Sequence, residues 1–337
     1  MKTRSLTEGA MLGALTVLLT LLGEYLGIPA VIVPVPLILL VFRQDFRWGI
    51  ITALVASLVT GLVAGHVFAG LSVIIWGFVG VAVGMALKEK LSFAKLMGVA
   101  VFANLVVIGL HMLLYALVIG GNMYTDLMNS FIQGFEQAIE TSRSLGAAEE
   151  SLVHLEIMLE LVPFLFRNGL PALLLLSSAF MAFVHLAVSR LVLKRMGETV
   201  PWVQPFTQWR LPAYCALFFF AGWILTQLAA LWDLPRWLEF AGVNLFFLSS
   251  TAYMVTGLSL AWFYFNQRRT PTFLRVLFVI LLFTTQLVLM LLVLLTVADG
   301  FFDFRRLMAR KAEVVKTEDT EDVQEAEVVD DRSDTED

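Results

Sequence analysis

The sequence is poor in the residue types on which most soluble enzymes depend. Its 337 residues include one cysteine, Cys215, and four histidines, and only 15% are charged. A single cysteine excludes an internal disulfide and any site with several thiolate ligands. The chain also lacks the GxxxxGK[ST], HExxH, GxSxG and CxxC motifs. We therefore expect no catalytic residues, no bound metal and no other cofactor, and we predict a protein that is not an enzyme.

Apolar residues dominate what remains. They make up 59% of the chain, and the mean hydropathy is +0.82. Apolar runs of about 20 residues recur from Leu6 to Val297, and a helix of that length crosses the ~30 Å hydrocarbon core of a bilayer. The pattern predicts an all-α, polytopic transmembrane bundle of eight or nine spans, with the lipid bilayer as its surroundings and no nucleic-acid partner.

The spans are expected between charged or proline-marked breaks, at residues 6–27, 30–42, 48–65, 68–87, 97–120, 170–192, 214–231, 240–265 and 273–297. The second is short and contains Pro34 and Pro36. Residues 121–167 are polar, with apolar positions at helical spacing. They predict an external insert of two amphipathic helices. The expected domains are residues 1–196 with this insert, further spans in 197–304, and a tail at 305–337.

The distribution of charge predicts the orientation of the chain. Lysine and arginine gather in alternate connections, around residues 2–4, 43–47, 88–95, 194–195 and 268–269, which marks the cytoplasmic side. Nine crossings would place the basic residues 305–311 outside, so either the short second segment does not cross fully or a late segment is misassigned. Residues 313–337 contain 12 acidic and two basic residues and no aromatic one, which predicts an acidic disordered tail. Its side of the membrane stays open.

Small residues are concentrated in the first third of the sequence. Residues 1–120 hold 14 of the 23 glycines, whereas residues 168–300 hold six. Small residues four positions apart share one helix face and let a second helix approach closely. Such pairs include Gly9/Gly13, Ala10/Ala14 and Gly80/Gly84. We expect the first five helices to form a tight bundle or to offer a face to a partner, and the bulkier later helices to be peripheral.

Polar residues at membrane depth are the candidate ligand-binding residues, because they are costly in lipid and often functional there. Asn104, His111 and Tyr115 lie seven and four residues apart, which places them on one face of the fifth span. Glu24 and His66 lie near the outer ends of the first and third spans. We predict that the five converge on an outward-facing pocket for a small polar molecule.

The alternative interpretation of these residues is structural. Glu24 and His66 would then reach headgroups or water, and Asn104 would bond a neighbouring helix. A metal site formed by Glu24, His66 and His111 is disfavoured. His185, near the inner end of the sixth span, is most simply interfacial.

Two stretches of the first third of the chain and the break between them resemble a known family. Residues 8–15, the proline-containing break at 28–36 and residues 47–65 resemble the substrate-binding S components of energy-coupling-factor vitamin transporters. Ala10 and Ala14 match the A-x-x-x-A pattern with which the first helix of those proteins docks a coupling subunit. The resemblance implies six S-component-like helices in residues 1–196, although the additional spans and the tail depart from it.

Three later stretches resemble the YybS-like family of uncharacterised bacterial polytopic membrane proteins: residues 209–212, 257–265 and 299–306. This resemblance covers roughly residues 5–308 and implies a multi-pass protein of the bacterial cytoplasmic (inner) membrane. We favour a substrate-capturing or transport-associated protein. The alternative is a non-transporting scaffold that recruits envelope or division partners through the acidic tail or the insert, and an intramembrane enzyme comes third.

Overall fold

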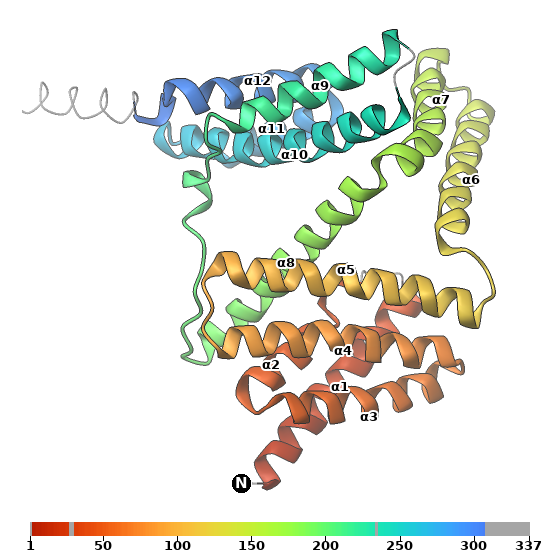
Figure 1. Cartoon of the computed structure of the whole chain (residues 1–337), viewed down its shortest axis with the longest axis vertical. Helices are drawn as coiled ribbons and strands as arrows, with labels where there is room; N and C mark the ends of the chain where they lie inside the picture. Colours follow the sequence, from red (N-terminus) through yellow and green to blue (C-terminus); the bar gives the residue numbers. More distant parts are fainter. Residues whose placement is uncertain (1, 27–29, 233–234, 307–337) are drawn as a thin grey trace, which may run out of the picture. The chain divides into compact units, whose positions relative to one another are not determined.

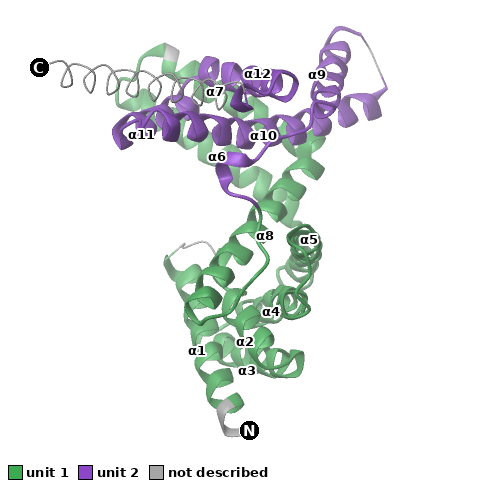
Figure 2. Cartoon of the chain, turned by 90° about the vertical axis from the view of Figure 1, so that its left-hand side faces the viewer, with its two compact units in different colours: residues 1–203 green, residues 204–337 purple. Residues whose placement is uncertain are grey.

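The structure is a computed structural model that describes residues 2–26, 30–232 and 235–306. Every regular element in these residues is a helix, as the apolar runs predict. The acidic tail expected at 305–337 lies almost wholly outside the described residues. The chain divides into two units, residues 1–203 and 204–337, which are coloured separately in Figure 2.

Unit 1 is a helical bundle centred on one apolar helix. Helix α4 packs against α2, α3 and α5, while α1 packs against α3 and α8 against α5. The apolar core lies among α2, α4, α5 and α8. The elements, labelled in Figure 1, are α1 (Lys2–Leu26), η1 (Ala30–Ile32), α2 (Val35–Arg43), α3 (Phe46–Ala64), α4 (Val67–Lys88), α5 (Phe93–Val118), α6 (Met123–Ser144), α7 (Glu149–Phe164), η2 (Leu165–Gly169) and α8 (Leu170–Arg195).

Glycines set the distance between α4 and α2. A Cβ added at Gly80 would lie 2.6 Å from the Cβ of Leu37, and one added at Gly84 would lie 2.7 Å from the Cβ of Val41. No side chain fits at such distances, so the two helices touch through their backbones. The tight packing expected from the Gly80/Gly84 spacing is present, and residues 35–41 of α2 are all buried.

The second expected span is wrong as a membrane-crossing helix. Helix α2 has nine residues and is about 14 Å long, half the thickness of the hydrocarbon core. Residues 30–43 nevertheless return the chain to the end of the bundle at which α1 begins, because the Arg43 guanidinium pairs with Glu8 at 2.7 Å. The Lys88 ammonium donates to the Gln44 carbonyl at 2.7 Å. Two of the basic connections therefore meet at one end, as the charge pattern predicts.

The insert contains two helices, joined by a non-helical connection at residues 145–148. Helix α6 presents one apolar and one polar face as expected, but α7 is not amphipathic and does not end where the sixth span was expected to begin. It continues through the π-helical segment η2 into α8. Residues 151–195 form a 45-residue apolar candidate span, about 67 Å long if straight. Pro163 and Pro171, which remove backbone donors, flank the π-helical segment.

Unit 2 has its own core, which corrects the expectation that the later helices are only peripheral. Phe219, Tyr253 and Val297 meet there. A Cβ added at Gly222 would lie 2.5 Å from the backbone nitrogen of Phe246, so α9 and α10 also cross in close contact. The elements are η3 (Phe206–Gln208), α9 (Cys215–Leu231), α10 (Arg236–Gln267), α11 (Thr272–Thr284) and α12 (Gln286–Phe302).

The number of candidate spans in the described residues is six or seven rather than eight or nine. Six helices are long and apolar enough to cross a membrane, and α9, with 17 residues, is shorter. The last expected span, 273–297, is two helices, α11 and α12, bent by 104° at one break. The cause is local, because Thr285 adopts an extended conformation and ends the helical hydrogen bonding of α11. The pair counts as one further span at most.

Candidate functional site

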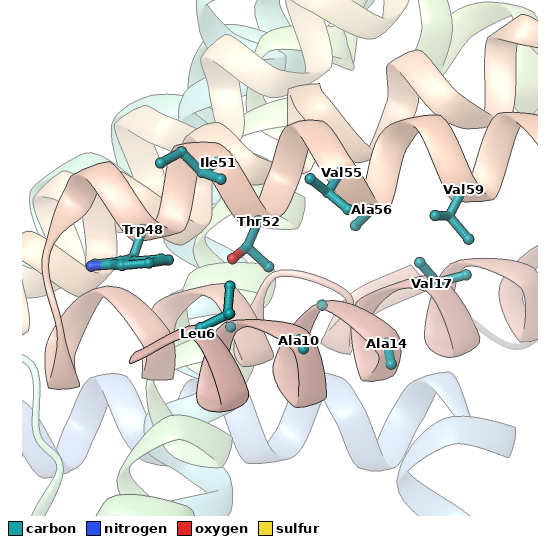
Figure 3. Close-up of a pocket in the computed structure, with 12 residues that line it drawn as sticks. Leu6, Ala10, Ala14, Val17, Trp48, Ile51, Thr52, Val55, Ala56 and Val59 are labelled. Atoms are coloured by element: carbon teal, nitrogen blue, oxygen red, sulfur yellow. The ribbon is translucent and has the colours of Figure 1, made fainter. Parts of the chain in front are cut away.

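The strongest candidate for a partner site is a groove between α1 and α3. It has a volume of about 410 Å³ and is almost entirely apolar. In Figure 3, α1 with Ala10 and Ala14 lies on one side and α3, which carries the Trp48 ring, lies on the other. The groove is lined by Leu6, Gly9, Ala10, Gly13, Ala14 and Val17 of α1 and by Trp48, Ile51, Thr52, Val55, Ala56 and Val59 of α3.

The two small-residue pairs of α1 have different roles. Gly9 and Gly13 are the less exposed pair, and a Cβ added to either would come within 3.1 or 2.9 Å of the Thr52 side chain. These glycines let α1 approach α3. Ala10 and Ala14, the predicted docking residues, are exposed and line the groove. The face of α1 with Gly9 and Gly13 thus packs against α3. The adjacent face, with Ala10 and Ala14, is exposed, so no packing contact within the described residues explains why alanine occupies these two positions.

Of the five residues predicted to form a ligand pocket, the structure brings Glu24 and His66 together. The Glu24 carboxylate accepts a hydrogen bond from the His66 ring at Nε2. The other ring nitrogen, Nδ1, accepts the backbone N–H of Ala69 and caps the start of α4. Since Nδ1 is an acceptor, the proton of a neutral His66 is on Nε2, where it faces Glu24.

The three polar residues on α5 each have a separate partner. The buried Asn104 amide donates to the Ala100 carbonyl of its own helix at 2.8 Å. His111 Nδ1 lies 2.9 Å from the Val107 carbonyl, and the Tyr115 hydroxyl donates to Asp126 at 3.0 Å. Asn104 therefore does not use the neighbouring helix that the structural alternative expected. No group of three or more metal-binding side chains occurs in the described residues.

His185 is a buried polar residue, so the interfacial position expected for it is wrong. It is completely inaccessible to solvent, and neither ring nitrogen makes a hydrogen bond of normal geometry with the described residues. The Trp76 ring lies between two histidines, 6.4 Å from His185 and 5.4 Å from His111 between centroids. We call these three residues the histidine–tryptophan cluster.

The sequence around His185 contains a pattern that indicates its burial. Ser178, Ala182, His185 and Ser189 are all buried in α8 and follow one another at intervals of four, three and four residues. That spacing defines one helix face. Small residues on the same face as a histidine indicate packing against other helices rather than contact with headgroups.

Unit 2 contains a buried charged group that was not among the candidates chosen from the sequence. Arg305 donates to the carbonyls of Thr207 and Trp209, the latter at 3.0 Å. Its guanidinium also reaches the Ser259 hydroxyl at 3.2 Å and lies 3.4 Å from the Asp299 carboxylate. We call these five residues the Arg305 cluster. It joins the three stretches that carry the YybS-like resemblance.

The charges around this cluster differ in their exposure. Burial lowers the pKa of the Arg305 guanidinium, and the negative charge of Asp299 opposes that shift, so arginine stays charged. Arg210 pairs with the Asp303 carboxylate at 2.9 Å in a half-exposed position. Partial burial alone would raise the pKa of Asp303, but the hydrogen bond and charge of Arg210 outweigh it and hold that pKa below its usual value.

Comparison with known proteins agrees with the later of the two resemblances. The family model described as predicted membrane protein (DUF2232) matches residues 11–300. A protein of Bacillus subtilis (strain 168), described as uncharacterized protein YybS, is 25% identical over 316 residues, which cover 90% of this chain and 98% of that protein. No solved structure matches the chain.

Proposed function

The chain belongs to the DUF2232 family of predicted membrane proteins, and from that premise we propose that it is a transport-associated membrane subunit. Unit 1 captures a small molecule and engages a membrane partner through the groove between α1 and α3. The protein itself catalyses no covalent step. This proposal extends the S-component resemblance of the first helices, which implies such a division of labour.

The observation that carries the proposal is the exposure of Ala10 and Ala14 in an apolar groove of about 410 Å³. In a bilayer, an apolar side chain is surrounded by lipid rather than water, so burying it between helices gives no hydrophobic gain. Helices therefore associate through close packing. Small residues permit the 8–10 Å separation at which that packing is effective. A helix laid over Ala10 and Ala14 fills the groove and contacts both α1 and α3.

Capture of a small molecule is supported by the histidine–tryptophan cluster. A buried polar group without a good partner costs about 1–3 kcal/mol, so its presence needs a compensating role. His185 is such a group, and Trp76 provides an aromatic surface beside it. A ligand with a hydrogen-bonding group and an apolar ring or chain would satisfy both side chains once the helices that bury His185 separate to admit it.

The proposal is tested by filling the groove. The double variant Ala10→Leu/Ala14→Leu adds two large side chains at exposed positions and should remove a co-purifying membrane partner at unchanged thermal stability. The matched control is Ala94→Leu/Ala116→Leu, which makes the same changes at exposed positions of α5. The readout is quantitative mass spectrometry of proteins retained by the tagged chain in mild detergent. Equal partner retention in the two double variants contradicts the proposal.

A membrane scaffold is the second candidate, and one observation favours it. Helix α6 is polar on most of its surface but exposes Leu127 and Phe131, with 46% and 49% of their surfaces accessible. Exposed apolar side chains on an amphipathic helix are typical of a protein-binding face. If Leu127→Ser/Phe131→Ser removes the partners while the Ala10→Leu/Ala14→Leu variant keeps them, the scaffold replaces the transport-associated subunit.

A further inference from the structure

A second cavity lies within unit 2, where α10, α11 and α12 diverge. Its volume is about 400 Å³. Leu260, Phe265, Phe278 and Leu292 supply apolar walls from all three helices. Polar groups occur only among the lining residues near the end of α10, where Tyr264, Arg268 and Thr270 contribute. The cavity is therefore amphipathic, with an apolar body and one cationic edge.

The bend at Thr285 gives this cavity its shape. Because α11 turns away from α12 by 104°, it does not pack along α10 and α12 as a straight continuation would. Leu282 is the buried residue of α11, whereas Phe273, Ile280 and Phe283 are 72%, 53% and 69% exposed. The space between the three helices is therefore not filled by side chains of the described residues.

The turn that holds the cationic edge is well defined. Arg275 donates to the carbonyls of Thr270 and Phe265 at 3.0 and 3.2 Å and to the Asn266 side chain at 2.9 Å. These bonds fix the connection between α10 and α11 and engage all three guanidinium nitrogens of Arg275. Arg268, in contrast, is exposed, and no carboxylate of the described residues pairs with it. It is the cation available at the edge of the cavity.

We infer that this cavity binds an anionic phospholipid, with an acyl chain among Leu260, Phe278 and Leu292 and the phosphate on Arg268. The apolar walls match an acyl chain, and a guanidinium is the side chain best suited to a phosphate. The basic connection at 268–269 is one of those assigned to the cytoplasmic side, where anionic lipids concentrate. This inference does not depend on the groove of unit 1.

The test is native mass spectrometry of the delipidated full chain, titrated with phosphatidylglycerol or with phosphatidylcholine of the same acyl chains. One basic residue contributes about 1 kcal/mol toward an anionic headgroup, so phosphatidylglycerol should be retained about fivefold better. Arg268→Gln should abolish this preference and Arg268→Lys should keep it. Arg269→Gln, beside it in the turn but not in the cavity lining, is the matched control and should behave as the unaltered chain.

Two further arms separate the acyl chain from the phosphate. Inorganic phosphate at equal concentration should not displace the lipid, since it cannot occupy the apolar body. Ala261→Phe, which fills the cavity, should reduce the retention of both lipids, while circular dichroism checks that the helices are intact. Equal retention of the two lipids, an equal effect of Arg268→Gln and Arg269→Gln, or displacement by inorganic phosphate would each overturn the inference.

Discussion

The two units are stabilised by different kinds of contact. In unit 1, glycines on α4 bring its backbone against α2, and the core around them is aliphatic. In unit 2, aromatic rings such as Phe219 and Tyr253, 5.7 Å apart, pack beside a buried charged group, the Arg305 cluster. Lipid removes the hydrophobic gain that drives soluble folding. Close backbone approach and internal polar bonding are the two remaining ways to hold helices together. Both units use the first, at Gly80 and Gly84 of α4 and at Gly222 of α9, and unit 2 adds the buried Arg305 cluster.

The largest effect is expected in unit 2 from removing one member of its buried ion pair. Arg305→Met leaves the buried Asp299 carboxylate with only the more distant Arg210, 3.9 Å away, as a charge partner and should lower the free energy of unfolding by about 3–5 kcal/mol. Adding Asp299→Leu should restore part of the loss, because neither charge is then left alone. Unfolding of unit 2 in detergent, followed by the fluorescence of its tryptophans, measures both. A double variant less stable than Arg305→Met would show that the contrast between the units is wrong.

The corresponding change in unit 1 acts through size instead of charge. In Gly84→Leu, the new Cβ would lie 2.8 Å from the carbonyl oxygen of Ile38, which is too close for a normal contact. The substitution should destabilise the unit by about 1–3 kcal/mol or prevent folding. Gly98→Leu is the control, because no atom lies within 4 Å of a Cβ added there. The control should be neutral or slightly stabilising. Thermal unfolding in the same detergent compares them, and equal destabilisation would contradict the role given to α4.

Variants in the histidine–tryptophan cluster distinguish a structural role from a ligand-binding role within unit 1. His185→Leu removes a buried polar group that has no good partner, so thermal stability should be unchanged or raised by about 1 kcal/mol. His111→Leu removes the bond to the Val107 carbonyl and should lower stability by about 0.5–1.5 kcal/mol. Both should weaken retention of a co-purifying small molecule, measured by mass spectrometry. Reduced stability in both variants with unchanged retention would make these residues structural.

The smallest effect is expected beside the Arg305 cluster, at the half-exposed pair of Arg210 and Asp303. Asp303→Asn breaks a half-exposed pair with Arg210 and should lower stability by at most about 1 kcal/mol. Because the pKa of Asp303 is below its usual value in the folded chain, its contribution is present above the ordinary carboxyl range and is lost as the pH falls through the lowered value. Stability of the Asp303→Asn variant should therefore depend less on pH below about 4. An unchanged acid dependence contradicts this assignment.

Local sequence patterns predicted the helices well and their interruptions poorly. Apolar runs identified almost every helix, and the small residues of α1 indicated a close helix contact, which the structure places against α3. The bend in the last expected span was missed, although Thr284, Thr285 and Gln286 interrupt an otherwise apolar run. A mean hydropathy over 20 residues stays high when three of them are polar. The helix, in contrast, ends where a single residue, Thr285, adopts an extended conformation.

The polar groups were harder to predict, because their partners are distant in sequence. Arg305 binds Ser259, 46 residues earlier, and Trp209, 96 residues earlier, and no periodicity connects such positions. Of the predicted pocket residues, Glu24 and His66 do meet, since both lie at the same end of the bundle. Asn104 and His111 lie on one helix, as their spacing requires, but each uses a carbonyl of that helix. Residues that share a helix face are predicted to point in the same direction, but the spacing does not predict which group each side chain bonds.

The central claim, that a partner helix occupies the groove between α1 and α3, is tested most directly by photo-crosslinking in intact cells. A photoreactive amino acid replaces Val55, which lines the groove, or Val63, which does not; both side chains are 58% exposed on α3. The account predicts a discrete protein adduct from position 55 that the Ala10→Leu/Ala14→Leu change abolishes, and no such adduct from position 63. The same pattern of adducts from both positions would contradict it.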